Sequence, residues 1–202
     1  MNEISMMENR QNAVYIPVSG MIESIQPMDG FGQPSGCYQI VTLRKGTGEE
    51  PDLMEQSADE ESMEENQDLP AVMPAEEQVC LVIGPDTCFV NGIRLYEGMN
   101  ITAFYDGNAP TLLIYPPQYR AVVVTEQVPG QNVMMARFNG SLTALDRSLK
   151  LNLDESVDII NENGQNFYGS LAGHILVVVY GAATRSIPPQ TTPYQVIVMC
   201  RE

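Results

Sequence analysis

The sequence has few basic residues and no long apolar run. Its 202 residues include ten Lys and Arg against 26 Asp and Glu, for a formal net charge of −16. Binding to a nucleic-acid backbone or to an anionic membrane surface needs clustered cations, which ten scattered residues do not supply. No apolar stretch approaches the about 20 residues that a membrane-spanning helix needs. We therefore expect no nucleic-acid partner and no membrane span.

Signatures of catalysis and of metal binding are also missing. His174 is the single histidine and is expected to be structural, because no second histidine accompanies it as a ligand. The glycines form neither a phosphate-binding loop nor a dinucleotide fingerprint, and no serine lies in a G-x-S-x-G turn. The sequence therefore predicts a protein that is not an enzyme and that carries no cofactor and no metal.

The cysteines are too far apart for a metal-binding or redox motif. Cys80 and Cys88 lie in or beside apolar runs, where an unpaired cysteine behaves as a small buried hydrophobe. A disulfide in an extracellular relative is the alternative.

Residues 1–13 are polar, show no leader peptide and are expected to be flexible. The default localisation is cytoplasmic, with an extracytoplasmic one if a leader has been removed.

The chain contains an internal echo. Ile114-Tyr115-Pro116-Pro117-Gln118-Tyr119 resembles Ser186-Ile187-Pro188-Pro189-Gln190-Thr191, and each run lies near the end of a β-rich half. Further matches follow in the same order: Val18–Ile22 with Phe138–Leu142, Asn91-Gly92 with Asn163-Gly164, Ile101–Tyr105 with Val177–Tyr180, and Ala121–Val124 with Gln195–Val198. A shared order of strands and turns predicts an internal duplication.

The sequence of each half predicts about five short strands and shows no helical period. We therefore predict an all-β protein. Residues 14–125 and 132–202 would form two tandem small OB-like five-stranded barrels, since closure removes exposed strand edges. A single β-sandwich is the alternative. Gly20 within the first strand indicates a bulge or a barrel bend. Asn91-Gly92 indicates a hairpin, and the apolar run 175–180 indicates a central strand.

An acidic segment interrupts the first half. Between Glu49 and Glu77 there are twelve acidic residues and no basic one, so the rest of the chain carries a net charge of only −4. Residues 46–77 are predicted to be a mobile insertion, because such a composition buries too little apolar surface to offset chain entropy. A short amphipathic helix that docks on a partner, through Leu53, Met54, Met63 and Leu69, is the alternative.

The second half also resembles a known family. Leu151-Asn152-Leu153, Asn163-Gly164, Val178-Val179-Tyr180 and the run Thr184–Pro193 resemble a β-barrel family of Gram-positive bacteria, found at times beside copper-amine-oxidase-N-like domains. The resemblance covers about a third of the chain directly. It implies a β-barrel, no known activity and no metal, and its members are often exported.

The Pro-Pro-Gln loops supply the candidate contact residues. Arg185 lies beside Thr184 and Gln190 in the second loop, and the first loop leads into Tyr119 and Arg120. Loops of small barrels commonly present ligands, and two arginines could receive a carboxylate or a peptide. The alternative is that the second loop is a stiff corner in which Arg185 pairs with a nearby acid.

Two functions are consistent with these features. The first is a non-catalytic binding or scaffolding protein whose ligand is a protein or peptide. The second is an accessory protein or enzyme that acts on a cell-envelope polymer.

Overall fold

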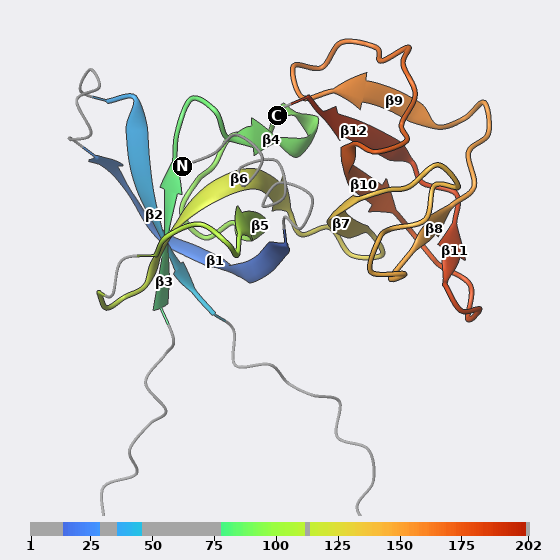
Figure 1. The fold of residues 1–202 in the computed structure, drawn as a ribbon. Coiled ribbons are helices and arrows are strands. Elements are labelled where there is room, and N and C mark those ends of the chain that lie inside the picture. Colours follow the sequence, from blue (N-terminus) through green and yellow to red (C-terminus); the bar gives the residue numbers. More distant parts are fainter. Residues whose placement is uncertain (1–13, 29–35, 46–77, 112–113, 201–202) are drawn as a thin grey trace, which may run out of the picture.

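The computed structural model describes residues 14–28, 36–45, 78–111 and 114–200, and all regular structure in these ranges is β apart from one 3-10 turn (Figure 1). In chain order the elements are β1 (Tyr15–Met28), β2 (Tyr38–Arg44), β3 (Gln78–Ile83), β4 (Cys88–Phe89), η1 (Val90–Gly92), β5 (Asn100–Asp106), β6 (Gln118–Glu126), β7 (Asn132–Arg137), β8 (Lys150–Leu151), β9 (Asp158–Asn161), β10 (Ile175–Tyr180), β11 (Gln190–Thr191) and β12 (Gln195–Met199). The predicted all-β class is confirmed.

The first half closes into a five-stranded barrel. Its strands follow the order β3-β2-β1-β5-β6, and a parallel pairing of β3 with β6 closes the ring. The interior is apolar and is filled by Val18, Ile22, Val41, Leu43, Val79, Leu81, Ile83, Met99, Ile101, Ala103, Ala121 and Val124. Closure pairs the edge strands that an open sheet would expose to other chains.

Gly20 allows β1 to pair with both β2 and β5. Residues 15–21 of β1 pair with β5 and residues 21–28 pair with β2, so the strand bends where the two ladders meet. A Cβ atom on Gly20 would lie 2.6 Å from the carbonyl oxygen of Arg44 on β2. Only glycine fits this close approach. The predicted bend is present, and a bulge follows it between Ile22 and Ser24.

The second half was expected to form a five-stranded barrel, but its strands are grouped into two separate sheets. It consists of a four-stranded sheet, β7-β10-β12-β9, and a separate parallel pair, β8 and β11. Between β7 and β8 the side chain of Asn139 accepts the backbone N–H groups of Ser141 and Thr143, and that of Asp146 accepts the N–H of Ser148. Such local bonds compete with strand pairing, and isolated bridges replace a ladder there.

The two halves share an apolar layer. Strand β10 shows this most clearly: Leu176 and Val178 point into the second half, whereas Ile175, Val177 and Val179 pack against the first half. This alternation follows from the two-residue period of a strand. Both faces of β10 are therefore buried, which explains its continuous apolar sequence, and its inner place in the sheet agrees with the predicted central strand.

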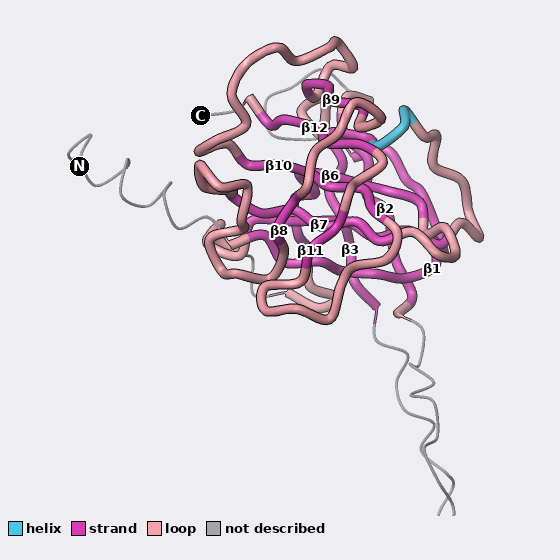
Figure 2. Tube along the Cα trace, turned by 90° about the vertical axis from the view of Figure 1, so that its right-hand side faces the viewer, coloured by secondary structure: helices cyan, strands magenta, loops and turns pink. Residues whose placement is uncertain are grey.

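The first half contributes the outward-facing side chains of β4 and β6 to this layer, together with Phe104 of β5. Phe104 is only 3% exposed, and the Cys88 thiol, buried in the same layer, lies 3.9 Å from the carbonyl oxygen of Glu162 in the second half. Cys80 is buried as well, so both thiols lie where the sequence placed them, and none of the four cysteines of the described ranges forms a disulfide. Figure 2, turned by 90°, shows the strands of the two halves one behind the other.

The halves use the same pairing senses. In the first half β1–β5 and β5–β6 are antiparallel and β4–β6 is parallel. In the second half β7–β10 and β10–β12 are antiparallel and β9–β12 is parallel. The series β1-β5-β6-β4 therefore has the same order and directions as β7-β10-β12-β9.

Specific hydrogen bonds also recur. Ile22 donates to the carbonyl of Met99 and accepts from Gly98, just as Phe138 donates to the carbonyl of His174 and accepts from Gly173. The second proline of each Pro-Pro run accepts a hydrogen bond from an earlier strand. The backbone N–H of Cys80 donates to the carbonyl of Pro117, and that of Lys150 donates to the carbonyl of Pro189. Each run is followed at once by a strand.

These contacts correct the register of the sequence comparison. Gly20 pairs with Ile101 in the first half, and the matching pair in the second half is Ala136 with Leu176. Gly140, which the comparison set against Gly20, lies in a turn and has open space around it. The sequence comparison therefore matched Gly20 with a residue four positions too late, at Gly140 instead of Ala136. Glycine is common both in bent strands and in turns, so it does not distinguish the two positions.

Other local expectations differ from the structure. Asn91-Gly92 does turn the chain, with φ values of 57° and 59°, but it does not form a hairpin, because β4 pairs with β6 instead of β5. Residues 111, 114 and 115, which lie between β5 and β6, are not part of a strand. The predictions for residues 1–13 and 46–77 lie outside the described residues. Strands β2 and β3, which flank 46–77, are antiparallel neighbours with Arg44 opposite Gln78, so the acidic segment joins adjacent strands of the barrel.

The close approach at Gly20 predicts a matched pair of variants. Gly20→Ala should lower the free energy of unfolding by about 1–3 kcal/mol, because the added Cβ must displace backbone of β2. Gly140→Ala should change it by no more than about 0.5 kcal/mol, because nothing lies near that position. Urea denaturation followed by circular dichroism measures both, and equal effects would contradict the role assigned to Gly20.

The shared layer predicts that the halves unfold together. Phe104→Ala should lower the free energy of unfolding by about 3–5 kcal/mol and should leave a single calorimetric transition, since both halves lose contacts to this ring. Two separate transitions, with only the first half destabilised, would show that the layer does not couple them.

Candidate ligand-binding site

A cluster of aromatic and charged side chains lies where β6 begins. Tyr119 of β6 stacks on Tyr105 of β5, with ring centroids 4.0 Å apart and planes at 17°. Both rings are partly buried against the interior of the barrel. The pairing of β5 with β6 passes over Val122, so Phe104 lies opposite Val123 and Tyr105 lies opposite Ala121. Because successive residues of a strand face opposite sides, Phe104 points to the shared layer while Tyr105 joins this cluster.

Arg120, the next residue, extends from the same strand into an ion pair. Its Nη2 atom donates to Oδ2 of Asp86, in the turn after β3, at 2.6 Å. The two side chains remain 58% and 46% exposed. The hydrogen bond to Asp86 is the main cause that raises the pKa of Arg120, and Tyr38 of β2 raises it further. The pair therefore presents a permanent cation and an anion side by side.

A cavity of about 300 Å³ joins these groups. Its lining comes from the end of β5, the β5–β6 loop, the start of β6 and the turn after β3: Asp86, Tyr105, Asp106, Ala109, Pro110, Thr111, Gln118, Tyr119, Arg120, Ala121 and Val122. We call this the tyrosine cavity. It combines aromatic surface with donors and acceptors, the pattern typical of small binding sites.

Tyr105 of the cavity stays protonated at neutral pH. Burial is the largest cause that raises the pKa of Tyr105 above 10.0, and the neighbouring Tyr119 adds to it through charge and hydrogen bonding. The cavity therefore offers the neutral hydroxyl group of Tyr105 beside the Arg120–Asp86 pair.

The second Pro-Pro-Gln loop is a stiff hairpin. The backbone N–H of Thr184 donates to the carbonyl of Gln190 at 2.8 Å, and the backbone N–H of Gln190 donates to Oγ1 of Thr184 at 2.9 Å. Ser186 bridges Thr184 and the carbonyl of Pro188. The predicted stiff corner is therefore present. Arg185 is exposed, and no acid within the described ranges pairs with it, contrary to the alternative in which it is neutralised locally.

The structure does not bring the two predicted loops together. Tyr119 and Arg120 line the tyrosine cavity, whereas Thr184, Arg185 and Gln190 do not contribute to it. In Figure 1 the start of β6 lies at the left of the molecule and the loop before β11 lies at the lower right. A single ligand group held by both arginines of one chain is excluded by this separation.

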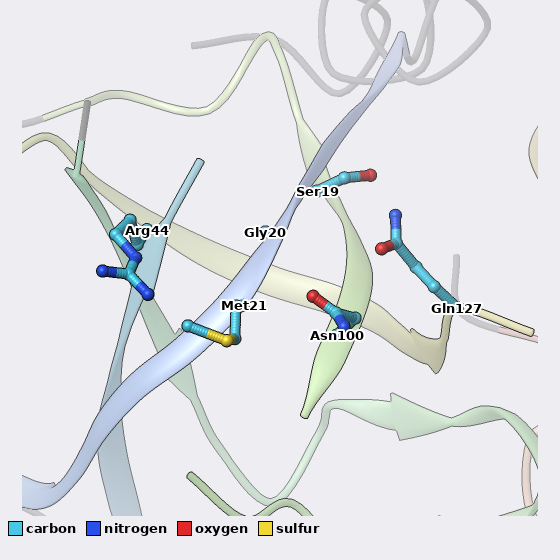
Figure 3. A pocket seen from close by; sticks show the side chains of 6 residues that line it. All are labelled: Ser19, Gly20, Met21, Arg44, Asn100 and Gln127. Atoms are coloured by element: carbon cyan, nitrogen blue, oxygen red, sulfur yellow. The ribbon is translucent and has the colours of Figure 1, made fainter. Parts of the chain in front are cut away.

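A second hollow, of about 450 Å³, lies over β1 and is shown in Figure 3. Its lining is Ser19, Gly20, Met21, Arg44, Asn100 and Gln127. Two of its polar side chains are already engaged, since Ser19 and Gln127 both bond to the hydroxyl of Thr102, at 2.7 and 3.2 Å. It has no aromatic lining, and we therefore centre the candidate site on the tyrosine cavity.

His174 lies away from this cavity, in the second half. Its ring packs edge-on against Phe167 with centroids 5.6 Å apart, and its Nδ1 atom is buried with no hydrogen-bond partner within the described ranges. No group of three His, Cys, Asp or Glu that could hold a metal ion occurs in the residues that the structure covers. Within the same ranges no helix is long and apolar enough to cross a membrane.

Sequence reasoning found Tyr119 and Arg120 but missed their partners. Asp86 lies 34 residues before Arg120 in a turn that the sequence marks only as Gly84-Pro85-Asp86. Tyr105 lies near the end of β5, and nothing in the local sequence shows that its ring stacks on Tyr119 of the neighbouring strand. Only a correct strand pairing, β3 beside β6 and β5 beside β6, would have brought them together.

No protein-family model matches the chain, and no curated protein is significantly similar to it. The resemblance of the second half to the Gram-positive β-barrel family stays a prediction.

The raised tyrosine pKa values predict alkaline destabilisation. The unfolded chain ionises Tyr105 near pH 10.0 and the folded protein does so at higher pH, so the contribution of Tyr105 to the free energy of unfolding should be complete below pH 10 and be lost as the pH rises through the folded pKa. Burial raises the pKa of Tyr180 in the same direction. Urea midpoints at about pH 8 and about pH 11 measure the loss, and Tyr105→Phe should reduce it. An equal loss in the variant would contradict the raised pKa of Tyr105.

Proposed function

We propose that this chain is a non-catalytic binding protein in which the tyrosine cavity of an OB-like barrel receives a peptide segment of a protein partner. The observation that carries the proposal is the combination, in one cavity, of stacked tyrosine rings with the half-exposed Arg120–Asp86 pair.

The chemistry of the cavity suits a peptide. Tyrosine and arginine are enriched in protein interfaces, where their large side chains combine apolar contact with hydrogen bonding. Arg120 can donate to a carbonyl or carboxylate of a ligand, and Asp86 and the tyrosine hydroxyls can accept from its N–H groups. Tyr115, which is 75% exposed, and Ile114 extend this surface along the preceding loop.

The position of the cavity supports the same proposal. OB-type barrels bind their ligands with the loops between strands and one face of the sheet. The closed five-stranded ring and its parallel closure by β3 and β6 support an OB-like assignment. The cavity lies beside the β5–β6 loop, which such barrels use for contacts.

We further propose that the two halves arose by duplication. The recurring pairing senses, the bonds made by Ile22 and Phe138, and those accepted by Pro117 and Pro189 support a common ancestor. The shared layer then turns two modules into one scaffold, in which the second half holds β5 and β6, and hence the cavity, in place.

A selection experiment tests peptide binding. Peptides selected from a random display library on the whole chain should bind the native protein, and Arg120→Ala should weaken them at least tenfold, because it removes a charge-assisted hydrogen bond of about 1.5–3 kcal/mol. Fluorescence anisotropy with labelled peptides measures the dissociation constants.

Arg94→Ala is the control, because Arg94 is an exposed arginine of the same barrel that does not line the cavity. Its peptide affinities should equal those of the native chain. Failure to select any peptide, or equal weakening by both substitutions, would refute the proposal. Binding to purified cell-wall polymer that Arg120→Ala abolishes would favour the accessory function on a cell-envelope polymer.

A further inference from the structure

One apolar side chain stands out on the second half. Ile187, at the tip of the loop between β10 and β11, is 98% exposed, although isoleucine is among the residues most often buried. Arg185 lies two residues before it and is also exposed. We call residues 182–189 the tip loop; it presents an aliphatic group and a cation together.

The tip loop is held rigidly. Besides the bonds of Thr184 and Ser186 described above, the hydroxyl of Thr191 donates to the carbonyl of Ala182 at 2.8 Å, and the carbonyl of Pro189 accepts from Lys150 at 2.8 Å. A loop whose conformation is fixed before binding loses little entropy when it docks. An exposed isoleucine on such a loop is therefore a ready contact point.

The tyrosine cavity has the complementary chemistry. It offers tyrosine rings and Pro110 to an aliphatic side chain, and its charged lining consists of Asp86 and Asp106 against Arg120, which leaves one negative charge in excess. Oδ1 of Asp106 accepts from the backbone of Asn108 at 2.9 Å, and a carboxylate has further acceptor sites for an arginine. An apolar group with a cation beside it matches this lining in both respects.

We infer that the tip loop of one copy of this chain docks in the tyrosine cavity of a second copy, with Ile187 against the tyrosines and Arg185 beside Asp106. The inference rests on the proposed function, since it names the peptide segment that the cavity receives. The start of β6, which lines the cavity, and the tip loop before β11 lie on opposite sides of the molecule (Figure 1), so the contact forms between copies.

Each copy has one tip loop and one cavity on different surfaces, so the contact is head-to-tail. A head-to-tail contact that does not close into a ring adds copies to an open chain. The assembly should therefore grow with protein concentration and should be limited to two copies when each partner can use only one of its two surfaces.

Sedimentation velocity of the purified full chain over a concentration series tests this. The native chain should form dimers and longer oligomers as concentration rises. Ile187→Ser removes the aliphatic contact, and Thr111→Arg places bulk and positive charge at the cavity mouth, where Thr111 is exposed. Each variant alone should associate at least tenfold more weakly than the native chain.

Mixing the two variants gives the decisive result. Ile187→Ser keeps an intact cavity and Thr111→Arg keeps an intact tip loop, so an equimolar mixture should form dimers with the affinity of the native contact and nothing larger. Recovery in the mixture cannot come from misfolding of either variant. A mixture that stays as weakly associated as its components would overturn the inference.

Two control variants, Tyr168→Ser and Asp146→Asn, separate this contact from nonspecific association. Tyr168→Ser removes another highly exposed apolar side chain, 91% exposed in the second half, and should leave association unchanged. Asp106→Asn should weaken it severalfold, whereas Asp146→Asn, at a similar turn carboxylate that accepts from Ser148, should not.

A native chain that remains monomeric at all concentrations, or that associates regardless of Ile187→Ser, would also overturn the inference. If selected peptides still bind in an Arg120-dependent manner, the proposed function stands and only the self-docking fails. If no peptide binds either, both fail.

Discussion

The apolar layer between the halves is the contact on which the rest of the structure depends. Strand β10 buries both of its faces, because Leu176 and Val178 fill the second half while Val177 and Val179 press on the first. The second half has short ladders of its own and two-residue strands at β8 and β11, so much of its apolar burial comes from this layer. A chain of this size that folded as two separate modules would bury a smaller fraction of its surface and would be less stable for it.

The layer also positions the candidate site. Strand β5 packs Phe104 into the layer and, one residue later, directs Tyr105 to the cavity, because successive residues of a strand face opposite sides. Strand β6 has the same double role, since Val123 faces the layer while Tyr119 and Arg120 line the cavity. The stacked tyrosines therefore lie on strands whose outer faces are covered by the second half. A site built on such strands is held more firmly than one built on loops alone.

The sequence predicted those features of the fold that depend on a residue and its immediate neighbours. The apolar run at β10, the bend at Gly20 and the burial of Cys80 and Cys88 each follow from side-chain type and immediate neighbours. The long-range pairings could not be obtained in this way, because β3 and β4 both pair in parallel with β6 across intervening strands, and nothing in Asn91-Gly92 shows that its flanking strands are not partners. The same limit applies to the site: Tyr119 and Arg120 lie at or just after the echoed Pro-Pro-Gln run, whereas Asp86 and Tyr105 join them only through the pairing of β3 and β5 with β6.

The two Pro-Pro-Gln loops have the same backbone role and different side-chain surroundings. Each second proline accepts a bond from an earlier strand, and each loop leads into a strand that continues that parallel pair. The first loop leads into Tyr119 and Arg120, so its surroundings form a concave, aromatic and net negative surface. The second presents Ile187 and Arg185, which form a convex and positive one. If the halves share an ancestor, divergence at a backbone corner common to both has produced two complementary surfaces on one chain, and the proposed head-to-tail contact needs no element beyond them.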